Sequence, residues 1–542
     1  MSHAITSTLD PQGETYTRQR EEMLALLAEV RDLEGRVRKN SEKARPKFEK
    51  RGQLMPRERV ARLLDPGSPF LEFSTLAGFK MHDDNGRKDV AGGGNVVGIG
   101  FVRGIRCLIS ANDSAIKGGS ITPMGLKKSL RAQEIALENR LPVVSLVESG
   151  GANLLYQSEL FVDGGRVFAN MARLSAAGVP QITVVHGSST AGGAYMPGLS
   201  DYVIAVRGRA KIFLAGPPLV KAALGEESSE EELGGAEMHA AVSGTADYLA
   251  EDDAHAIELA RDLVAQVGAN PSFAPGPVPA AEVLPPRYDP DELCGVVPVD
   301  ARQPYDVREV IARVVDDSQF LTFKEGFGEE TVCGHAKVDG VAVGILGNNG
   351  PIMPEGSVKA AQFIQLCCQT DTPLVYFMNT TGYMVGKEAE QRGAIKHGSK
   401  MIQAVSNATV PQFTFVIGGG YGAGNYGMCG RAYDPRFIFA WPNSKVAVMG
   451  GAQAAKVMDI ITRAKFARMG MPLDEDALAA MSGQVRDKLD SEATALFATA
   501  RIWDDGIIDP RDTRTVLAFC LHVAREASDR TLHPNTFGVA RG

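Results

Sequence analysis

A glycine-rich stretch at residues 187–195 has the composition of an anion-binding turn. The apolar run 182–185 before it predicts a strand, and the small residues from Ala191 onward predict the start of a helix. The amides of Gly192 and Gly193 would then be uncovered by side chains and partly positive, as amides at a helix start are. Inside a cavity they could stabilise a carbonyl oxygen that becomes an oxyanion. Taken alone, the stretch also fits a close-packed turn that binds nothing, which is a common use of such residues.

The chain repeats this region 231 residues later. Pro142 precedes an apolar run, and Pro373 does so at that offset. The tripeptide Val-Pro-Gln occurs at 179–181 and again at 410–412, each time before a β-rich run. Two matches at one offset indicate an internal duplication, and therefore two copies of one domain.

The duplication predicts two copies of the glycine-rich turn. The offset places Gly192 and Gly193 opposite Ala423 and Gly424, which lie within the glycine-rich residues 418–426. Each copy of the domain is therefore expected to carry one turn that can stabilise an oxyanion. The sequence has no recognisable catalytic triad and no metal-ligand spacing, so we expect neither a triad nor a metal.

Length, charge and composition limit the class of protein. The chain has 542 residues, enough for two or three domains with sizeable cores, and the duplication favours two. Hydrophobic residues make up an ordinary 44% of the chain. The 59 glycines are about 11% of the 542 residues, above the usual share of about 7%. A formal net charge of −8 argues against a nucleic-acid partner, which would call for a basic face.

The cysteines and the first residues indicate the compartment. The seven cysteines are odd in number and include no Cys-x-x-Cys spacing, which indicates reduced thiols in a reducing compartment. The N-terminal residues contain no apolar signal region, and no run approaches the roughly 18 apolar residues of a membrane span. We therefore expect a cytoplasmic protein that has no membrane partner.

A proline-rich segment separates the two copies. Residues 270–286 contain six prolines and little periodicity, which predicts an extended linker. We divide the chain into an N-terminal domain (1–275), a linker (276–297) and a C-terminal domain (298–542).

β-rich runs alternate with helical patterns in the first copy, which predicts an α/β fold. Residues 100–109 and 334–343 each predict a hairpin with glycine near its turn. Helices are predicted at 15–50, 124–138, 166–177 and 251–267, with a helical tail at 450–496.

Several separated motifs, in one order, resemble those of a known family. They are Arg51-Gly52, Arg57-Glu-Arg59, Leu64-Asp-Pro-Gly67, Lys117-Gly-Gly119, Ala191-Gly-Gly-Ala-Tyr195 and Ala423-Gly-Asn-Tyr-Gly-Met428. From about residue 15 to near its end, the chain resembles the carboxyltransferase β subunits of biotin-dependent acyl-CoA carboxylases. The resemblance implies two tandem crotonase-like domains of β-β-α superhelical units. Gln53 departs from the lysine of many relatives, which weakens any phosphate contact at that position.

The resemblance also implies a role for both turns. Carboxyl transfer leaves negative charge on the ureido oxygen of biotin and on the thioester oxygen of the deprotonated acyl-CoA. By position, Gly192 and Gly193 would hold the thioester enolate, and Ala423 and Gly424 the biotin oxygen, beside Asn425. The ureido nitrogen can take the proton, so no side-chain base is implied. Further acyl-CoA contacts are implied for Ala191, Ala194, Tyr195, Tyr426, Lys117, Gly118 and Gly119.

A second subunit is implied as well. The chain contains no Met-Lys-Met biotinylation motif and has no room for a biotin carboxylase. A partner α subunit would therefore carry the biotin and use ATP and bicarbonate. In relatives the active site lies between two β subunits, which implies at least a homodimer and, by family, a hexamer.

Residues at a few positions of the family motifs indicate which acyl group the substrate carries. His397 and Tyr426 are typical of the branch that carboxylates the γ carbon of 3-methylcrotonyl-CoA and geranyl-CoA. Methylcrotonyl relatives carry a bulky Phe where this chain has Gly164, next to Gly165. An empty apolar space of that size would cost about 3–5 kcal/mol unless something fills it. We therefore expect geranyl-CoA, with 3-methylcrotonyl-CoA as the alternative. The two glycines could instead form a helix-start turn whose volume a neighbouring side chain fills.

Other activities on the same fold stay open at this point. A hydratase or isomerase would need a carboxylate over the acyl carbons, and Glu148 is the one candidate. We expect Glu148 to support the site instead, because a hydratase needs no second oxyanion turn. A scaffold, another acyl-CoA carboxylase β subunit, or a biotin-dependent decarboxylase subunit with membrane partners are further alternatives.

Overall fold

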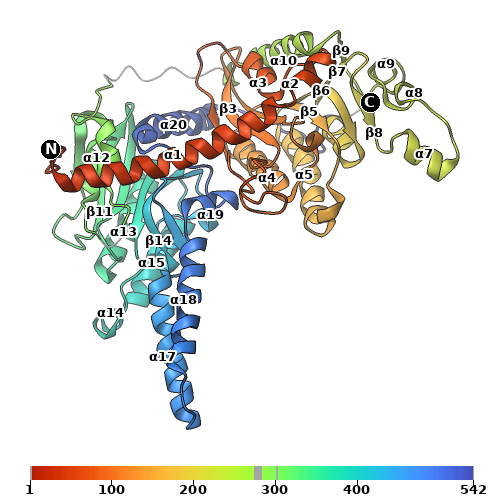
Figure 1. The fold of residues 1–542 in the computed structure, drawn as a ribbon. Helices are drawn as coiled ribbons and strands as arrows, with labels where there is room; N and C mark the ends of the chain where they lie inside the picture. The colour runs from red at the N-terminus through yellow and green to blue at the C-terminus, as the bar shows by residue number, and fades with distance from the viewer. Residues whose placement is uncertain (1–2, 274–282, 301–302, 541–542) are drawn as a thin grey trace. The chain divides into compact units, whose positions relative to one another are not determined.

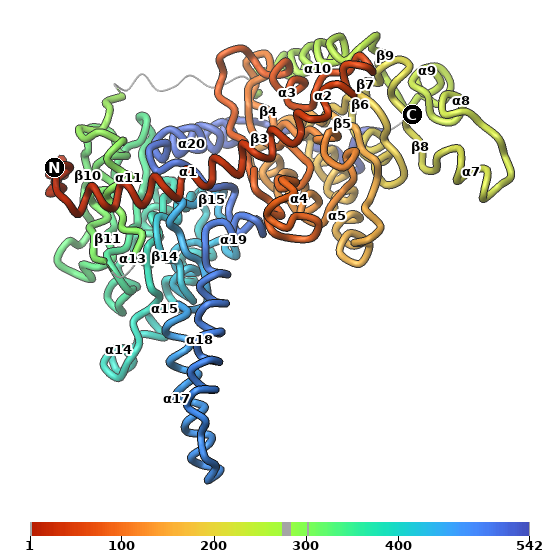
Figure 2. Tube along the Cα trace, in the orientation of Figure 1, coloured from red at the N-terminus to blue at the C-terminus, as the bar shows by residue number. Residues whose placement is uncertain are grey.

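The computed structural model describes residues 3–273, 283–300 and 303–540 (Figures 1 and 2). The chain forms two compact units, and each contains one eight-stranded sheet. We call residues 32–278, 500–502 and 522–542 the first-copy unit, and residues 1–31, 279–499 and 503–521 the second-copy unit. Sheets with crossover helices in two units confirm the predicted α/β class and its two domains.

The first-copy sheet joins an antiparallel hairpin to a parallel series. β3 and β4 form the predicted hairpin, and β4, β5, β6, β7 and β9 run parallel in that order, with β8 beside β6. Parallel neighbours require crossovers, which α4 and α5 supply for β5 and β6. The strands are β2 (Leu71–Glu72), β3 (Asn95–Val102), β4 (Ile105–Asn112), β5 (Val143–Ser149), β6 (Gln181–Thr190), β7 (Tyr202–Val206), β8 (Lys211–Phe213) and β9 (Tyr248–Ala250).

Local sequence explains where the crossover helices begin and end. Thr122 accepts a hydrogen bond from the amide of Gly125 and so caps α4, and the C-cap of α5 is Gly178, in a left-handed conformation at φ 84°. The helices of this unit are α2 (Arg45–Lys50), α3 (Pro56–Leu63), α4 (Pro123–Glu138), α5 (Gln157–Ala177), α6 (Tyr195–Gly198), α7 (Pro217–Leu224), α8 (Glu230–Gly234), α9 (Ala236–Met238) and α10 (Asp253–Gly268).

The second-copy sheet has the same plan. Its hairpin is β11 and β12, followed by parallel β13, β14 and β15, with β16 beside β14 and β10 and β1 beyond β11. Its strands are β1 (His3–Ala4), β10 (Gln319–Thr322), β11 (Thr331–Val338), β12 (Val341–Asn348), β13 (Leu374–Thr380), β14 (Gln412–Tyr421), β15 (Phe437–Ala440) and β16 (Lys445–Ala447). Its helices are α11 (Leu293–Val296), α12 (Val307–Ala312), α13 (Pro354–Gln369), α14 (Lys387–Gln391), α15 (Ala394–Ser406), α16 (Gly422–Gly427), α17 (Gly451–Met469) and α18 (Glu475–Glu492).

The element bounds confirm the internal duplication. α4, β5 and β6 recur as α13, β13 and β14, each displaced by 231 residues. β3 and β4 recur as β11 and β12, displaced by 236 residues. The backbone agrees in detail, because Ala191 (φ 53°) and Gly422 (φ 51°) are left-handed at equivalent positions.

The units differ from the predicted domain ranges at both ends of the chain. Residues 1–31 group with the second copy, because β1 pairs with β10. Residues 522–542 group with the first copy, where Glu526 Oε1 accepts from Arg106 Nε at 2.8 Å. Two helices extend across these boundaries, α1 (Glu14–Glu42) and α20 (Thr513–Asp529), and α19 (Ala495–Ala500) ends at one.

The predicted linker and helices need smaller corrections. Residues 276–282 of the linker lie outside the described residues, and Pro290–Glu292 and Leu293–Val296 at its end are helical turns rather than extended chain. The helix predicted at 15–50 breaks into α1 and α2. The helix predicted at 166–177 begins earlier, at Gln157, because the helix accommodates the pair of glycines that we expected to precede it.

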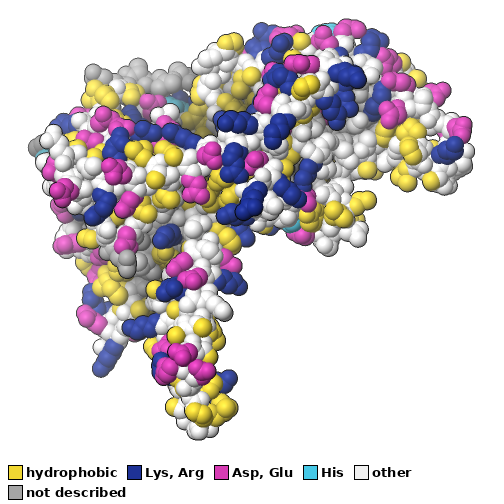
Figure 3. All heavy atoms as spheres, viewed as in Figure 1, with side chains coloured by type: hydrophobic (Ala, Val, Ile, Leu, Met, Phe, Trp, Pro, Cys, Tyr) yellow, Lys and Arg dark blue, Asp and Glu magenta, His cyan; other side chains and the backbone are white. Residues whose placement is uncertain are grey.

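The predicted helical tail forms two helices, α17 and α18, which pack together and project from the second-copy unit (Figure 1). Met469 at the end of α17 and Met471 in the turn before α18 are about half exposed, and hydrophobic atoms are visible at the free end of the pair in Figure 3. Within the described part of the chain, no helix is both long and apolar enough to cross a membrane. The seven cysteines are free thiols in this structure.

Candidate active site

The first glycine-rich turn has the predicted strand–turn–helix form. β6 ends at Thr190, and a 3-10 helix, Ala191–Ala194, follows and leads into α6. Ala191 has a left-handed φ of 53°, a conformation that costs a non-glycine residue roughly 1–2 kcal/mol. The amide of Gly192, at the second helical position, has no acceptor within the helix and is available to a ligand.

The second turn repeats this geometry. β14 ends at Tyr421, and α16 begins with Gly422 in the left-handed conformation. Ala423 is exposed and Gly424 is buried. The side chain of Asn425 turns inward, since its Nδ2 donates to Met378 Sδ at 3.4 Å.

Close packing disfavours a side chain at one position of the first turn and excludes it at the equivalent position of the second. A Cβ on Gly193 would lie 3.3 Å from Ser149 Oγ, and a Cβ on Gly424 would lie 2.7 Å from Gly382 Cα. Ser149 in turn donates to the carbonyl of Gly119 at 3.2 Å. The preceding position is open in both copies: a Cβ on Gly192 would meet only Phe168, at 3.8 Å, and Ala423 already carries one.

A cavity of about 610 Å³ lies beside Gly192, within the first-copy unit. This volume is typical of a small-molecule site. Its walls come from β4, β5, α4 and α5, and apolar side chains such as Leu126, Leu160 and Phe168 dominate the lining. Leu154 and Phe161, also in the lining, are 78% and 85% exposed, so the cavity opens to the surface of this unit. Among the described residues that line it, none is charged.

Gly164 and Gly165 line this cavity from the interior of α5. Outside its own turn of α5, a Cβ built on either glycine would have no described atom within 4 Å. No described side chain therefore fills the space, and because both glycines lie inside α5 the helix-start alternative is wrong. Each glycine in a helix interior costs about 1 kcal/mol relative to alanine. Packing within the described chain therefore does not explain this pair.

Two tyrosines occupy equivalent positions just after the turns. Tyr195 and Tyr426 are separated by 231 residues and are 45% and 43% exposed. The ring of Tyr195 packs on Phe168, a cavity residue, with 5.2 Å between centroids. Tyr426 packs on Tyr433 at 5.6 Å in the second-copy unit. Ala194, which precedes Tyr195, is buried.

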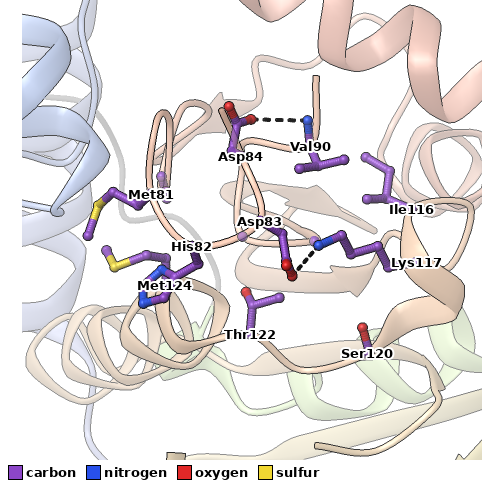
Figure 4. A pocket seen from close by; sticks show the side chains of 14 residues that line it. Met81, His82, Asp83, Asp84, Val90, Ile116, Lys117, Ser120, Thr122 and Met124 are labelled. Carbon is purple, nitrogen blue, oxygen red and sulfur yellow. Dashed lines mark hydrogen bonds and ion pairs between the residues drawn. The ribbon is translucent and has the colours of Figure 1, made fainter. Parts of the chain in front are cut away.

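The Lys117-Gly118-Gly119 motif forms a 3-10 turn at the edge of a small neighbouring pocket (Figure 4). Lys117 Nζ forms an ion pair with Asp83, and the hydroxyl of Tyr156 donates to Asp83 at 2.9 Å. The bond from Lys117 lowers the pKa of Asp83. Lys117 thus already has an anionic partner, while Gly119 supports Ser149 beside the first turn.

A buried ionic network, which the sequence did not reveal, stabilises the strands that carry the first turn. Arg59 Nη1 donates to Glu148 at 2.8 Å and its Nε to Asp253 at 3.1 Å. His186 Nδ1 lies 2.9 Å from the same Asp253 carboxylate. Gln53 Nε2 donates to the carbonyl of His186 at 3.1 Å. The sequence pointed to three of these residues separately, Arg59 in a motif, Gln53 as a departure from relatives and Glu148 as a candidate carboxylate, but not to their pairing. Glu148 is buried and paired with Arg59.

Comparisons with known proteins agree with these features. A carboxyl transferase domain matches residues 47–539. A Mycobacterium tuberculosis protein named as a probable biotin-dependent acyl-coenzyme A carboxylase β2 subunit is 51% identical over 539 residues, covering 99% of this chain and all of that protein. The biotin-dependent 3-methylcrotonyl-coenzyme A carboxylase β1 subunit of the same organism is 48% identical over 490 residues, covering 90% and 91%. The solved structure of the P. aeruginosa geranyl-CoA carboxylase β subunit has 59% identity and a TM-score of 0.93, with both chains fully covered.

Acid should destabilise the first-copy unit through His186. Burial, and next the nearby Arg59, lower the pKa of His186 below its usual 6.5. Below that pH the unfolded chain binds more protons than the folded one, so this contribution to stability is complete above pH 6.5 and is lost as the pH falls. We expect the thermal midpoint to fall more between about pH 7.5 and about pH 5.5 for the native sequence than for His186→Asn, which keeps a donor toward Asp253. Equal shifts in thermal scans of the two proteins would contradict this.

Proposed function

The chain belongs to the carboxyl transferase family, and from this premise we propose that it transfers a carboxyl group from carboxybiotin, held by a partner α subunit, to the γ carbon of geranyl-CoA. One observation carries the choice of substrate: Gly164 and Gly165 open into a cavity of about 610 Å³ beside Gly192. A β subunit of an acyl-CoA carboxylase needs a cavity for the acyl group. The volume of this cavity is larger than a five-carbon acyl group would fill.

The two turns fit a division of labour between two developing oxyanions. The first turn, at Gly192 and Gly193, lies at the cavity and would stabilise the thioester oxygen as the acyl group loses its proton. The second turn, at Ala423 and Gly424, offers helix-start amides to the ureido oxygen. Biotin, when bound, supplies the carboxyl group, and its ureido nitrogen can accept the proton. No charged side chain lines the cavity among the described residues, which supports a reaction without a side-chain base.

A matched substitution tests the substrate. Gly164→Phe and Gly165→Phe each place a ring where a Cβ meets nothing within 4 Å, so the ring can occupy the cavity without disturbing the helix. We expect kcat/KM for geranyl-CoA to fall by about 100-fold or more in at least one variant, because overpacking excludes the long chain, while 3-methylcrotonyl-CoA is affected little. The measurement is the ratio of the two kcat/KM values in the reconstituted αβ enzyme.

Gly483→Phe is the control for this test. Gly483 is also a helical glycine with nothing within 4 Å, but it lies on α18. Gly483→Phe should leave the ratio of the two kcat/KM values unchanged. If both cavity variants also leave the ratio unchanged, the acyl chain does not pass Gly164 and Gly165, and the 3-methylcrotonyl-CoA alternative stands instead.

A second matched pair tests the two turns. Gly192→Val and Ala423→Val place a branched side chain at equivalent, open positions, so folding should survive in both. We expect Gly192→Val to lower kcat for acyl-CoA carboxylation by about 100-fold or more, the cost of losing one oxyanion donor. Decarboxylation of carboxybiotin without an acyl acceptor should persist in Gly192→Val and fail in Ala423→Val. Identical behaviour of the two variants in that half-reaction would refute the assignment.

Partners follow from the same proposal. We propose that an α subunit brings the biotin and consumes ATP and bicarbonate, and that the chain forms homo-oligomers with shared active sites, a hexamer by family resemblance. Free and mostly buried cysteines support a cytoplasmic location. Purification of the tagged chain with a biotinylated soluble protein, and ATP-dependent carboxylation by that pair, would support this; turnover by the chain alone would contradict it.

A further inference from the structure

The cavity has a polar floor at its far end from the first turn. Ser145, Val147 and Ser149 share one face of β5, and all three line the cavity. Ser149 lies beside the turn, and Ser145 is four residues further along the strand, about 13 Å away at about 3.3 Å per residue. Ser110 on β4 pairs with Ser145 in the sheet register and also lines the cavity. The end of a long acyl chain would therefore reach two adjacent serines.

The two floor hydroxyls are available to a ligand. Within the described chain, neither Ser110 Oγ nor Ser145 Oγ has a hydrogen-bond partner. Their polar neighbours are engaged with one another: Asn112 Nδ2 donates to Asn95 Oδ1 at 3.0 Å, and Ser129 Oγ donates to the carbonyl of Gly125 at 3.0 Å. A cavity floor with two free hydroxyls is suited to an oxygen of the bound molecule.

The second copy provides an internal comparison. By register, Leu346 and Tyr376 stand where the first copy has Ser110 and Ser145. Both are fully buried in the core of that unit, and the hydroxyl of Tyr376 donates to Gln412 at 2.7 Å. The fold itself therefore fills this space with large side chains. At these two positions of the described chain, serines line a cavity in the first copy, whereas large buried side chains stand in the second.

Space by itself does not explain serine at these positions. Alanine at 110 and 145 would open slightly more volume and would leave no polar group facing an apolar chain. A hydroxyl that loses its water to an isoprenoid end without a new partner costs free energy. A carboxylate is also disfavoured, because no lining residue described here is cationic.

We propose that Ser110 and Ser145 form a subsite for an uncharged oxygen at the far end of the acyl chain, so that the substrates include isoprenoid acyl-CoA thioesters with a terminal hydroxyl or carbonyl group. This inference rests on the proposed function. It implies that the reaction which supplies the substrate is an oxidation or hydroxylation at the end of the chain remote from the thioester.

The test compares geranyl-CoA with the same thioester carrying a hydroxyl on its terminal carbon, in the αβ holoenzyme. The native enzyme should carboxylate the hydroxylated substrate with the higher kcat/KM. In the double variant Ser110→Ala, Ser145→Ala, the ratio of the two kcat/KM values should fall by about tenfold or more, the size expected for a lost hydrogen bond. In this double variant kcat/KM for geranyl-CoA itself should rise, because its apolar chain end no longer removes water from two unpaired hydroxyls.

Ser129→Ala is the matched control, since its hydroxyl is already bonded to Gly125, and it should not change the ratio. A ratio that the double variant leaves unmoved, with geranyl-CoA still turned over, overturns the subsite and leaves the proposed function intact. Turnover of 3-methylcrotonyl-CoA with neither long substrate accepted overturns both. Thermal midpoints of the variants separate these outcomes from unfolding.

Discussion

The left-handed residue that turns a strand into a helix is the constraint on which each candidate site depends. At Ala191 and at Gly422 the chain leaves a parallel strand and enters a helix within one residue, at φ values of 53° and 51°. This turn leaves the first helical amides without internal acceptors. Ala191 adopts the conformation without the freedom of glycine, at a cost that the surrounding structure must offset. Such strain is commonly found where backbone donors serve a function.

The surroundings of the first turn show what offsets that cost. Ser149, at the end of the adjacent strand, bonds to Gly119 and approaches Gly193 closely. Behind it, Arg59 joins the carboxylates of Glu148 and Asp253 in a buried network. Breaking one partner of such a buried network costs several kcal/mol, about 3–5 in typical cases. This buried network thus holds the strand that leads into the turn, and its charged residues do not line the cavity.

Local signals in the sequence were enough to predict the fold class, the duplication and the form of the two turns. Proline, glycine and apolar runs repeat at one offset, and the family resemblance was confirmed, while the roles of individual site residues stay predictions. Features set by contacts between distant residues could not be predicted. The pairing of β1 with β10 places the N-terminal residues in the second-copy unit. The bond from Arg106 to Glu526 places the C-terminal helix end in the first-copy unit. The pairing of His186 with Asp253 had no sequence signal, whereas the serines at 110 and 145 could have been found by aligning the two copies in register.

The central claim is that the turn at Gly192 and Gly193 receives the thioester oxygen while the acyl chain enters the cavity of the same unit. A crystal structure of the αβ enzyme with a slowly reacting geranyl-CoA analogue that keeps the thioester oxygen tests this directly. The account predicts that oxygen at about 2.7–3.1 Å from one of the two amide nitrogens, with the isoprenoid chain against Gly164 and Gly165. A thioester oxygen at the turn of Ala423 and Gly424, or an acyl chain outside the cavity, would contradict it.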